Sequence, residues 1–287
     1  MNKLSLYIFY YISGLIILIL NKIRYKIKGY TTPNTIKSGD IYSKITYDQE
    51  VVDRWEKWLI DYTENKTPFD KKNMLELGPG NDLGTGVFCI EKGASSYTAY
   101  DKNSLAINKN QTIYNSLLKI LKNQRTRVAL ESFIKSEESI LKYMTDKTFN
   151  FKTLENKYSC IVSQAAFEHF EDIQKTIKNF SEKSVSGAVL CTEIDLQTHS
   201  RWIREKDPNN IYRFPAWLFK LLNYTGIPNR IRPEDYKNIL EKNGWTKIKI
   251  IPLITISEND LKTQLLSKDF KNKNMHILTC AVLATKL

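Results

Sequence analysis

A glycine-rich corner between an apolar segment and a helix constrains this chain more than any other feature. Residues 74–84 read Met-Leu-Glu-Leu-Gly-Pro-Gly-Asn-Asp-Leu-Gly, and a second apolar segment ends in a carboxylate at position 101. A strand that enters a glycine turn and a helix, followed by a strand that ends in an acid, is how an α/β sheet builds a nucleoside pocket. Glycines at 78 and 80 let a ligand lie against the backbone, where a Cβ would block its approach.

The spacing of the glycines distinguishes two kinds of cofactor. A dinucleotide fingerprint needs glycine at position 83, where the chain has leucine, and the third glycine stands at 84. This spacing, with an acid at 76, resembles motif I of the class I S-adenosylmethionine-dependent methyltransferases. In that family the acid and the loop hold the methionyl half of the cofactor, and the next strand's acid binds both ribose hydroxyls. The resemblance implies a cofactor site made of Glu76, Gly78, Pro79, Gly80 and Asp101. The alternative is an ordinary strand–turn–helix corner without a ligand.

Three further segments match the same family. Residues 158–170 resemble its fourth strand and the turn after it, with Gln164 at the strand end and a Glu-His pair opening the next helix. Residues 187–195 read as the fifth strand, and 244–252 with 276–284 read as a closing antiparallel pair. We expect helices over 105–123 and 129–143, with 124–127 between them. A third strand over 140–145 would place Asp146 where the family often reads the adenine amino group, although this segment could equally continue the helix.

These matches imply an α/β fold. It is a Rossmann-like, seven-stranded, mostly parallel sheet with helices on both faces and an antiparallel C-terminal strand. The chain of 287 residues, 42% of them apolar, is long enough for one such domain over residues 71–287. The segment 29–70 contains an amphipathic helix at 48–62, and in the family a helix at this place covers the cofactor cleft. Packing of its aromatic residues onto the sheet is the simpler interpretation.

Composition excludes some functions. The four cysteines stand singly in apolar surroundings, which indicates neither a disulfide framework nor a zinc site. The net charge of +12 comes from lysines spread almost evenly along the chain, without a basic helix that carries interleaved aromatic residues. We therefore expect a solvated surface and no nucleic-acid partner.

The amino terminus predicts an attachment to membrane. Residues 4–20 form an apolar run that would measure roughly 25 Å as a helix, which is the lower limit for crossing a bilayer. Basic residues follow it directly, so we expect residues 1–28 to be an uncleaved anchor with the domain on the cytoplasmic side. The alternatives are a helix that lies in the membrane interface or one that merely covers the domain.

A hydroxyl acceptor would need a base, and the sequence offers few candidates. His199 follows the fifth strand at the carboxyl edge of the sheet, where acceptors bind in open α/β folds, and Asp195 could orient its ring. A surface histidine without a catalytic role is the alternative. Some family members bind a metal through an acid three positions before a Glu-His pair such as 168–169, but position 165 is alanine here. We therefore expect no metal site, and a lining or capping role for that pair.

The segment 201–232 contains five of the nine arginines, together with several large aromatic residues. Arginine suggests planar recognition of a carboxylate or phosphate, so we interpret the region 197–232 as an insertion that covers an anionic substrate. Ordinary ion pairs with nearby acids are the alternative. The predicted substrate-binding residues are Arg201, Arg213, Trp217, Arg230 and Arg232.

The pattern of residues 213–219, 228–236 and 240–245 resembles bacterial methyltransferases that are associated with cell-surface polysaccharide biosynthesis. The resemblance implies transfer of a methyl group from S-adenosylmethionine to an oxygen of a small, glycan-linked or lipid-linked acceptor at the membrane. Two other classes stay open at this point. One is an NAD-dependent sugar-nucleotide oxidoreductase with a similar corner, and the other is a membrane-tethered subunit of methyltransferase fold without activity.

Overall fold

Short apolar segments between residues 73 and 195 form the parallel part of a sheet. They are β1 (Asn73–Leu77), β2 (Ser96–Asp101), β3 (Leu141–Thr145), β4 (Tyr158–Gln164) and β5 (Ser184–Asp195). β6 (Trp245–Thr255) and β7 (Ile277–Lys286) complete the order β3-β2-β1-β4-β5-β7-β6. β7 runs antiparallel to β5 and β6, and the other neighbours pair in parallel. The predicted Rossmann-like sheet with an antiparallel C-terminal strand is confirmed.

The structure is a computed structural model. It describes residues 3–29, 41–106, 111–154, 157–257, 259–260, 265–271 and 273–287, and the side chain of Arg201 lies outside the description.

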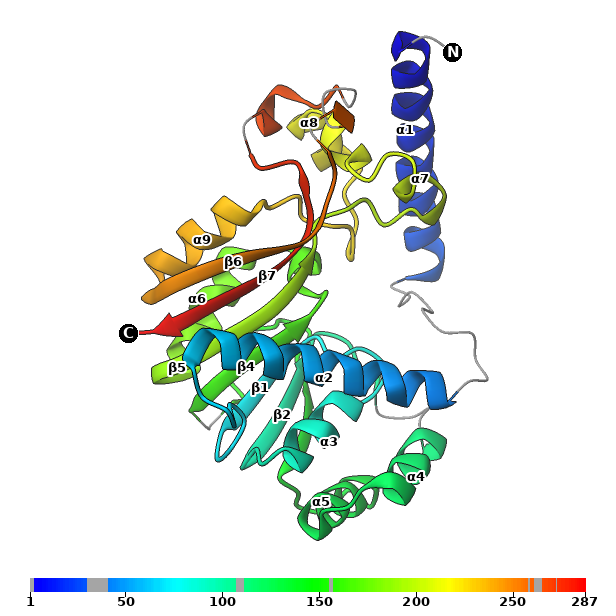
Figure 1. Ribbon diagram of the computed structural model, residues 1–287. Helices are drawn as coiled ribbons and strands as arrows, with labels where there is room; N and C mark the ends of the chain where they lie inside the picture. The colour runs from blue at the N-terminus through cyan, green and yellow to red at the C-terminus, as the bar shows by residue number, and fades with distance from the viewer. Residues whose placement is uncertain are drawn as a thin grey trace.

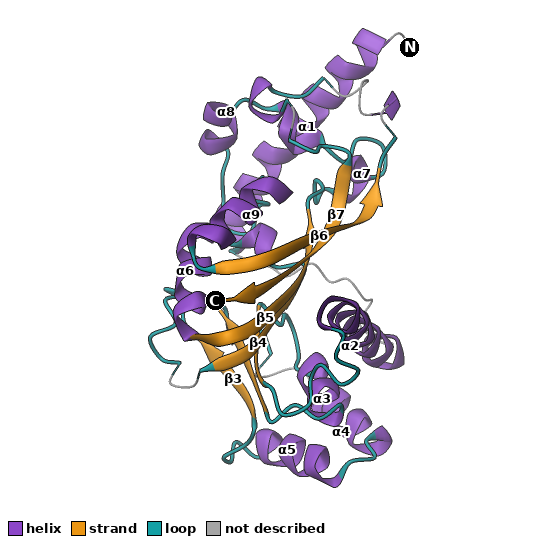
Figure 2. Ribbon diagram, turned by 60° about the vertical axis from the view of Figure 1, so that its left-hand side comes forward, coloured by secondary structure: helices purple, strands orange, loops and turns teal. Residues whose placement is uncertain are grey.

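Helices cover both faces of the sheet (Figures 1 and 2). One face carries α2 (Ile41–Thr63), α3 (Gly84–Glu91), α4 (Gln111–Ile120) and α5 (Gln124–Ile134), whose apolar side chains form one core cluster with the strands. The other face carries α6 (Ile173–Lys183) and α9 (Pro233–Lys242) over a second cluster. Because both faces are covered, the inner strands read as continuous apolar runs, and β7 is buried from Ile277 to Ala284.

Two helix boundaries differ from the sequence prediction. α5 begins at Gln124, inside the segment that we expected between two helices, because the Asn123 side chain accepts the Arg125 N–H at 2.9 Å and caps the first turn. The helix ends at Ile134 and does not continue to 143, since Ser136 has a left-handed φ of 59°. The third strand then begins at Leu141, as the strand interpretation required. Part of the helix expected over 105–123 lies outside the described residues.

The insertion between β5 and α9 packs against the amino-terminal helix. It contains α7 (Arg201–Arg204), the 3-10 turn η2 (Asn210–Arg213) and α8 (Ala216–Leu221), and the later turn η3 (Lys268–Phe270) joins it. These elements share a third apolar cluster with Leu18 of α1 (Lys3–Lys28). A Cβ at Gly14 would lie 2.0 Å from Asn210 Oδ1, so only glycine permits this approach. Among the described helices, α1 has the length and composition to cross a membrane.

Candidate active site

A cleft of about 480 Å³ opens at the carboxyl ends of the parallel strands. Its walls come from the loops after β1, β2 and β4, from the first two turns of α2, and from residues Thr225 and Gly226 of the insertion. Ligands bind at this edge in open α/β sheets, because loops from neighbouring strands converge there. The predicted cofactor residues that line it are Glu76, Gly78, Pro79, Gly80, Asp101 and Gln164.

The loop after β1 needs glycine at two positions. Gly78 and Gly80 have φ values of +73° and +79°, which L side chains rarely adopt. A Cβ at Gly78 would also lie 2.6 Å from the Cβ of Ala166, whereas a Cβ at Gly80 would meet no atom within 4 Å. The turn closes when the Asp82 side chain accepts the Gly84 N–H at 2.8 Å, at the start of α3. The loop is therefore shaped so that a ligand can lie against its backbone.

Glu76 is a buried acid at the floor of the cleft. Its side chain is 2% exposed, and the Thr85 hydroxyl donates to Oε2 at 3.1 Å. Burial raises the pKa of its carboxyl to about 8. A positively charged group placed against this carboxyl would favour the ionised form. The position suits the ammonium of an amino acid.

Asp101 stands at the end of β2 and faces the same cleft. Its Oδ1 accepts the Asn103 N–H at 3.0 Å, while burial raises the pKa of the carboxyl to about 6. Across the cleft, the Oε1 atom of Gln164 is buried without a hydrogen-bond partner. Gln164 Oε1 therefore lacks a donor, and both side chains could accept hydrogen bonds from a ribose diol or an amino group.

Asp146 occupies a different place from the other cofactor candidates. Its carboxylate accepts the Tyr100 hydroxyl at 3.0 Å and the Thr148 N–H at 2.8 Å, so it closes the turn after β3. These and further hydrogen bonds lower the pKa of Asp146 to about 2, against the effect of burial. The side chains of this turn that line the cleft are Thr148 and Phe149. A contact of Asp146 with adenine stays a prediction.

The first turns of α2 close one side of the cleft. Lys44 forms an ion pair with Asp82 of the glycine loop, and Asp48 lies so close that a Cβ at Gly84 would be 2.1 Å from its Oδ2. Asp48 Oδ2 has no hydrogen-bond partner, and burial together with Asp82 raises its pKa well above the usual range. Sequence alone could not identify Lys44 and Asp48 as cleft residues, because their spacing on the helix indicates only an amphipathic helix.

The charges in the cleft fit a cation. Glu76, Asp48 and Asp101 are buried acids in a chain whose net charge is +12, and each faces the same cavity. Ionisation of a buried carboxyl costs free energy unless a positive group is near. A ligand with a sulfonium and an ammonium supplies such charges, and the glycine loop leaves room for it. The buried acids that line this cleft therefore fit S-adenosylmethionine.

Two imidazoles meet beyond the cofactor loop. His169 lies in the 3-10 turn η1 (Phe167–His169) and lines the cleft, and its ring centroid is 4.7 Å from that of His199 in the loop after β5. Burial and His199 lower the pKa of His169 to about 4. Asp195 Oδ2 lies 3.5 Å from His199 Nε2 and 2.6 Å from Arg204. The structure thus brings the two predicted catalytic residues together, and adds His169.

Three of the predicted substrate-binding arginines are buried in the insertion. Arg213 pairs with Asp207 at 2.7 Å, and Arg230 stacks on Phe219 while it donates to backbone carbonyls. Arg232 is 0% exposed and donates to the carbonyl oxygens of residues 274 and 277. The structure therefore places Arg230 and Arg232 in the framework of the insertion, whereas Arg213 also lines a cavity beside α1. Binding of substrate by these arginines stays a prediction. Arginine suits these buried positions because one guanidinium can donate hydrogen bonds to several carbonyl oxygens at once.

Of the two remaining predicted substrate residues, only Trp217 has a described side chain. Trp217 on α8 is 68% exposed and lies outside the cleft walls. For Arg201, whose side chain is not described, the prediction is untested. The cations that line the cleft are lysines: Lys44, Lys102 and Lys175.

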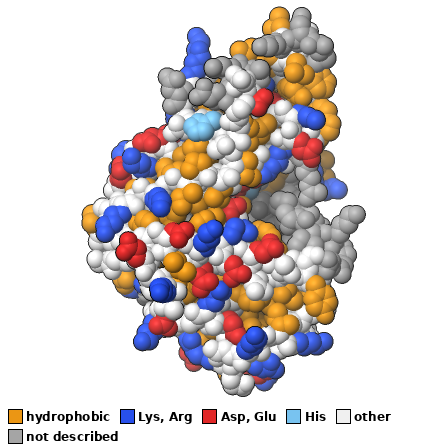
Figure 3. Space-filling view, in the orientation of Figure 1, with side chains coloured by type: hydrophobic (Ala, Val, Ile, Leu, Met, Phe, Trp, Pro, Cys, Tyr) orange, Lys and Arg blue, Asp and Glu red, His pale blue; other side chains and the backbone are white. Residues whose placement is uncertain are grey.

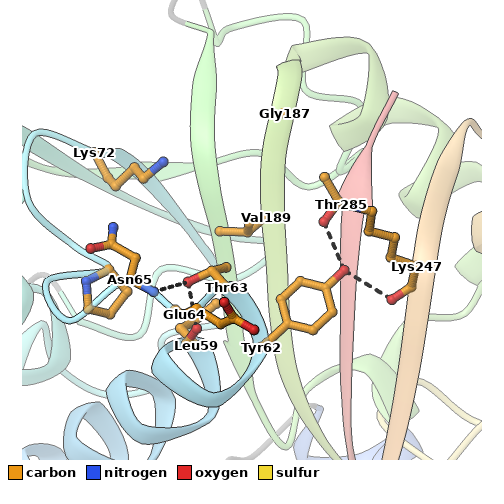
Figure 4. Close-up of a pocket in the computed structure, with 11 residues that line it drawn as sticks. Leu59, Tyr62, Thr63, Glu64, Asn65, Lys72, Gly187, Val189, Lys247 and Thr285 are labelled. Atoms are coloured by element: carbon orange, nitrogen blue, oxygen red, sulfur yellow. Dashed lines mark hydrogen bonds between the residues drawn. The ribbon is translucent and has the colours of Figure 1, made fainter.

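Two other cavities lie away from the glycine loop. One, of about 430 Å³, lies where the end of α2 meets β5, β6 and β7, at the opposite edge of the sheet (Figure 4). Its Tyr62 hydroxyl bonds to Thr285 Oγ1 at 2.8 Å and Lys247 O at 3.0 Å, which ties the helix to the sheet. The second, of about 880 Å³, separates α1 from the insertion and includes Arg204.

A family model described as a methyltransferase domain matches residues 47–250. The chain belongs to this methyltransferase family. No curated protein matches the sequence. Among solved structures, the CurJ carbon methyltransferase superposes with a TM-score of 0.50 and 14% identity, over 99% of this chain and 70% of that one. At such identity the likeness shows the fold alone.

Two further solved structures are similar at lower scores. A candidate S-adenosylmethionine-dependent methyltransferase from Listeria monocytogenes has 13% identity and a TM-score of 0.48, over 84% of this chain and 99% of that one. Magnesium protoporphyrin IX methyltransferase from Synechocystis PCC 6803 has 13% identity and a TM-score of 0.46, with both chains fully covered.

The family model and the acidic cleft at the glycine loop together identify the protein as an S-adenosylmethionine-dependent methyltransferase. This membership sets aside the oxidoreductase that the sequence left open. It agrees with the misplaced third glycine, which had argued against a dinucleotide.

Proposed function

We propose that the methyltransferase methylates a hydroxyl oxygen of an acceptor that binds beside His169 and His199. The observation that carries the proposal is the imidazole pair itself, which lies 4.7 Å apart at the end of the cofactor cleft. A neutral hydroxyl is a weak nucleophile, and its proton must be removed as the new bond forms. An imidazole pair backed by the Asp195 carboxylate suits that task.

Different residues of the cleft bind different parts of the cofactor. We assign the methionyl ammonium to Glu76 with the backbone of Gly78 and Gly80, and the ribose hydroxyls to Asp101. Gln164, whose Oε1 is buried without a partner, accepts a hydrogen bond from the amino group of the cofactor's methionyl half. Asp48 and Lys44 on α2 close the cleft and keep water out, which strengthens each of these charged contacts.

The reaction requires alignment more than activation of the methyl group. When bound, S-adenosylmethionine supplies a methyl group on a sulfonium, which is a good leaving group. His199 takes the hydroxyl proton, Asp195 orients its ring, and the acceptor oxygen attacks in line with the carbon–sulfur bond. The electron pair of that bond stays with sulfur. Phe149 and Phe170 line the cleft and exclude water.

We further propose that the acceptor is attached to a membrane and that α1 lies along the membrane surface. Its residues from Tyr7 to Lys22 contact the insertion, where Asn210 donates to the Tyr10 carbonyl at 2.9 Å and Arg213 stacks over Tyr7 at 5.2 Å. A helix that shares these turns with a polar domain fits an interfacial orientation better than a spanning one. The basic end of α1 favours the cytoplasmic face.

The cavity between α1 and the insertion supports a lipid-linked or glycan-linked acceptor. Tyr7 and Tyr10 of α1 form one wall, and Arg204 on the other wall holds Asp195 at 2.6 Å. An acceptor that leaves the membrane along α1 would therefore reach the side of the imidazole pair opposite the cofactor. An anionic group on this acceptor would meet Arg204 or Arg213, which both line this cavity, or the lysines of the cofactor cleft.

The cofactor assignment is tested by isothermal titration of the purified protein with S-adenosylmethionine, S-adenosylhomocysteine and NAD. We expect binding of the first two and none of NAD, and a preference for NAD would overturn the assignment. The acceptor is found by mass spectrometry of envelope glycans and lipids from cells with and without the gene. Loss of one methyl group from one species identifies it.

With the acceptor in hand, His199→Ala tests the reaction. We expect kcat to fall by roughly 10²–10⁴-fold, the usual contribution of acid–base catalysis, while the Kd of S-adenosylmethionine stays nearly constant. His276→Ala removes an imidazole from the turn before β7 and serves as the matched control. Equal kcat values for the two variants would reject the role of His199.

A further inference from the structure

Three potential metal ligands converge at the acceptor end of the cleft. Glu168 and His169 come from the turn after β4, and His199 comes from the loop after β5. One ligand atom from each lies within 4.8 Å of the other two. A carboxylate and two imidazoles at such distances can move by small rotations onto one ion, whose bonds to N and O measure about 2.0–2.2 Å.

Glu168 has no partner for its charge. Its side chain is 2% exposed, and neither carboxylate oxygen makes a well-formed hydrogen bond in the described structure. Burial and the nearby Asp195 raise its pKa well above the usual range, although the backbone amides of 168 and 195 act in the opposite direction. A buried carboxyl without a donor or cation is costly, and an ion placed between Glu168 and the imidazoles would remove that cost.

The two imidazoles are held as metal-binding histidines are held. His169 Nδ1 lies 2.7 Å from the Gly226 carbonyl oxygen, so Nδ1–H donates there and the lone pair is on Nε2. Asp195 lies 3.5 Å from His199 and is itself fixed by Arg204. A carbonyl or carboxylate behind each ligating imidazole orients the ring and increases its basicity.

We propose that Glu168, His169 and His199 bind a divalent transition-metal ion of the zinc type. Two imidazoles and one carboxylate are the ligand set of several catalytic zinc sites, in which a further position stays open to water or substrate. Imidazole ligands favour zinc, cobalt or iron over magnesium. His169 lines the cleft, so the open position of the ion faces the acceptor.

The role of the ion in catalysis rests on the proposed methylation of a hydroxyl, and the ion replaces His199 as the group that activates it. The acceptor hydroxyl binds at the open position, where the ion lowers the pKa of the hydroxyl and its proton passes to solvent. The oxygen then forms the bond to the methyl carbon, and the electron pair of the broken carbon–sulfur bond stays with sulfur. In this scheme His199 holds the ion and does not itself take the proton.

The site is tested first by binding, which needs neither cofactor nor acceptor. The full-length protein is stripped with EDTA and dialysed, and Co²⁺ is then titrated with its visible absorption as the signal. We expect one equivalent per chain, and displacement by Zn²⁺. Glu168→Gln and His199→Ala should each weaken binding by at least about 10–100-fold. Glu182→Gln and His276→Ala, matched changes outside the cluster, should bind as the unmodified protein does.

The outcomes separate the inference from the proposed function. Absence of Co²⁺ binding by the unmodified protein, or equal affinity in Glu168→Gln, overturns the metal site. The affinity for S-adenosylhomocysteine, measured for each variant, shows whether the fold is retained. Methyl transfer that persists in EDTA but is lost in His199→Ala leaves the proposed function and rejects the ion. A bound ion without methyl transfer to any hydroxyl acceptor rejects the proposed function instead.

Discussion

At the scale of single residues, the cleft contains buried carboxyl groups that have no positively charged side chain beside them in the described structure. Glu76 and Glu168 are both 2% exposed and both have raised pKa values. Such groups reduce the stability of the free protein and are retained where a ligand compensates them. In our proposals, each acid has a positive partner: the cofactor ammonium beside Glu76 and a metal ion beside Glu168.

The free protein should lose stability as the pH rises, because of Glu76. Its pKa is about 8 when folded and near its ordinary 4.5 when unfolded. The unfolded chain therefore releases this proton first, and the stabilisation present below pH 4.5 is lost as the pH rises through 8. Between pH 6 and pH 8 we expect this residue to lower the free energy of unfolding by about 2 kcal/mol.

Urea unfolding of the cofactor-free protein at the two pH values measures this effect. Glu76→Gln has no titrating carboxyl and should show a smaller decrease, whereas Glu182→Gln on the surface should behave as the unmodified protein. An identical decrease in Glu76→Gln and in the unmodified protein would contradict the assignment of this pH dependence to Glu76.

The two loop glycines should respond differently to alanine. Gly78→Ala combines a φ of +73° with a Cβ only 2.6 Å from Ala166, so we expect it to destabilise the protein by more than about 2 kcal/mol. Gly80→Ala has the φ of +79° but open space around its Cβ, so the cost should be nearer 1 kcal/mol. Thermal unfolding separates the two. Titration with S-adenosylhomocysteine should show that Gly80→Ala chiefly weakens cofactor binding, since its methyl group enters the cleft.

At the scale of elements, the insertion is a small domain built around buried guanidinium groups. Arg232 at the start of α9 reaches the segment before β7, and Arg230 holds carbonyls of η2 and the residue after it. These contacts fasten three loops that have little regular structure of their own. The insertion therefore keeps its shape beside the cleft without a long helix or strand.

Arg232→Met should destabilise the whole fold. Methionine keeps much of the volume but leaves the carbonyls of residues 274 and 277 without their donor, which costs about 1–3 kcal/mol for each buried group. We expect a lower midpoint of thermal unfolding, with an unchanged affinity for S-adenosylhomocysteine below that midpoint. Trp217→Ala, at a 68% exposed position of the same insertion, is the control and should change the midpoint little. A change in acceptor KM without a change in stability would favour substrate binding by Arg232 after all.

At the scale of the molecule, exposed hydrophobic side chains gather along α1. Hydrophobic side chains follow α1 in the space-filling view, while acidic and basic side chains are interspersed over the lower part of the same face (Figure 3). On α1 the exposed stripe includes Ile8, Ile12 and Ile16, and Trp202 and Leu221 of the insertion are also exposed. Tryptophan is typical of membrane interfaces, so α1 and the insertion form one membrane-facing unit in our proposal.

Membrane binding should depend on that exposed stripe. Ile12 and Ile16 are 50% and 51% exposed, so the double change to Asp should leave the fold intact while it removes apolar contact with lipid. We expect sedimentation with vesicles that contain anionic lipid to fall by at least about tenfold, with unchanged binding of S-adenosylhomocysteine. The control is Val128→Asp on α5, at a position that is 49% exposed. Ile113→Asp is unsuitable because it would break a buried contact. Equal sedimentation of both variants would contradict the proposed surface.

The sequence by itself determined the sheet, the cofactor corner and the family. Strands and glycine turns are local patterns, because side-chain periodicity and positive φ angles are set within a few residues. Glu76, Gly78, Gly80 and Asp101 could be placed for the same reason. The N-cap at Asn123 is also a local signal, and the sequence analysis missed it.

The tertiary structure alone decided which distant side chains meet. The arginines of the insertion looked free in sequence, but the carbonyls that accept their N–H groups lie up to 45 residues away. The sequence offered no third ligand beside the Glu-His pair, because position 165 is alanine, but the fold brings His199 from the loop after β5 to Glu168 and His169. Asp48 reaches the glycine loop only because α2 crosses the sheet edge. Such contacts depend on how elements pack, and spacing along the chain does not contain that information.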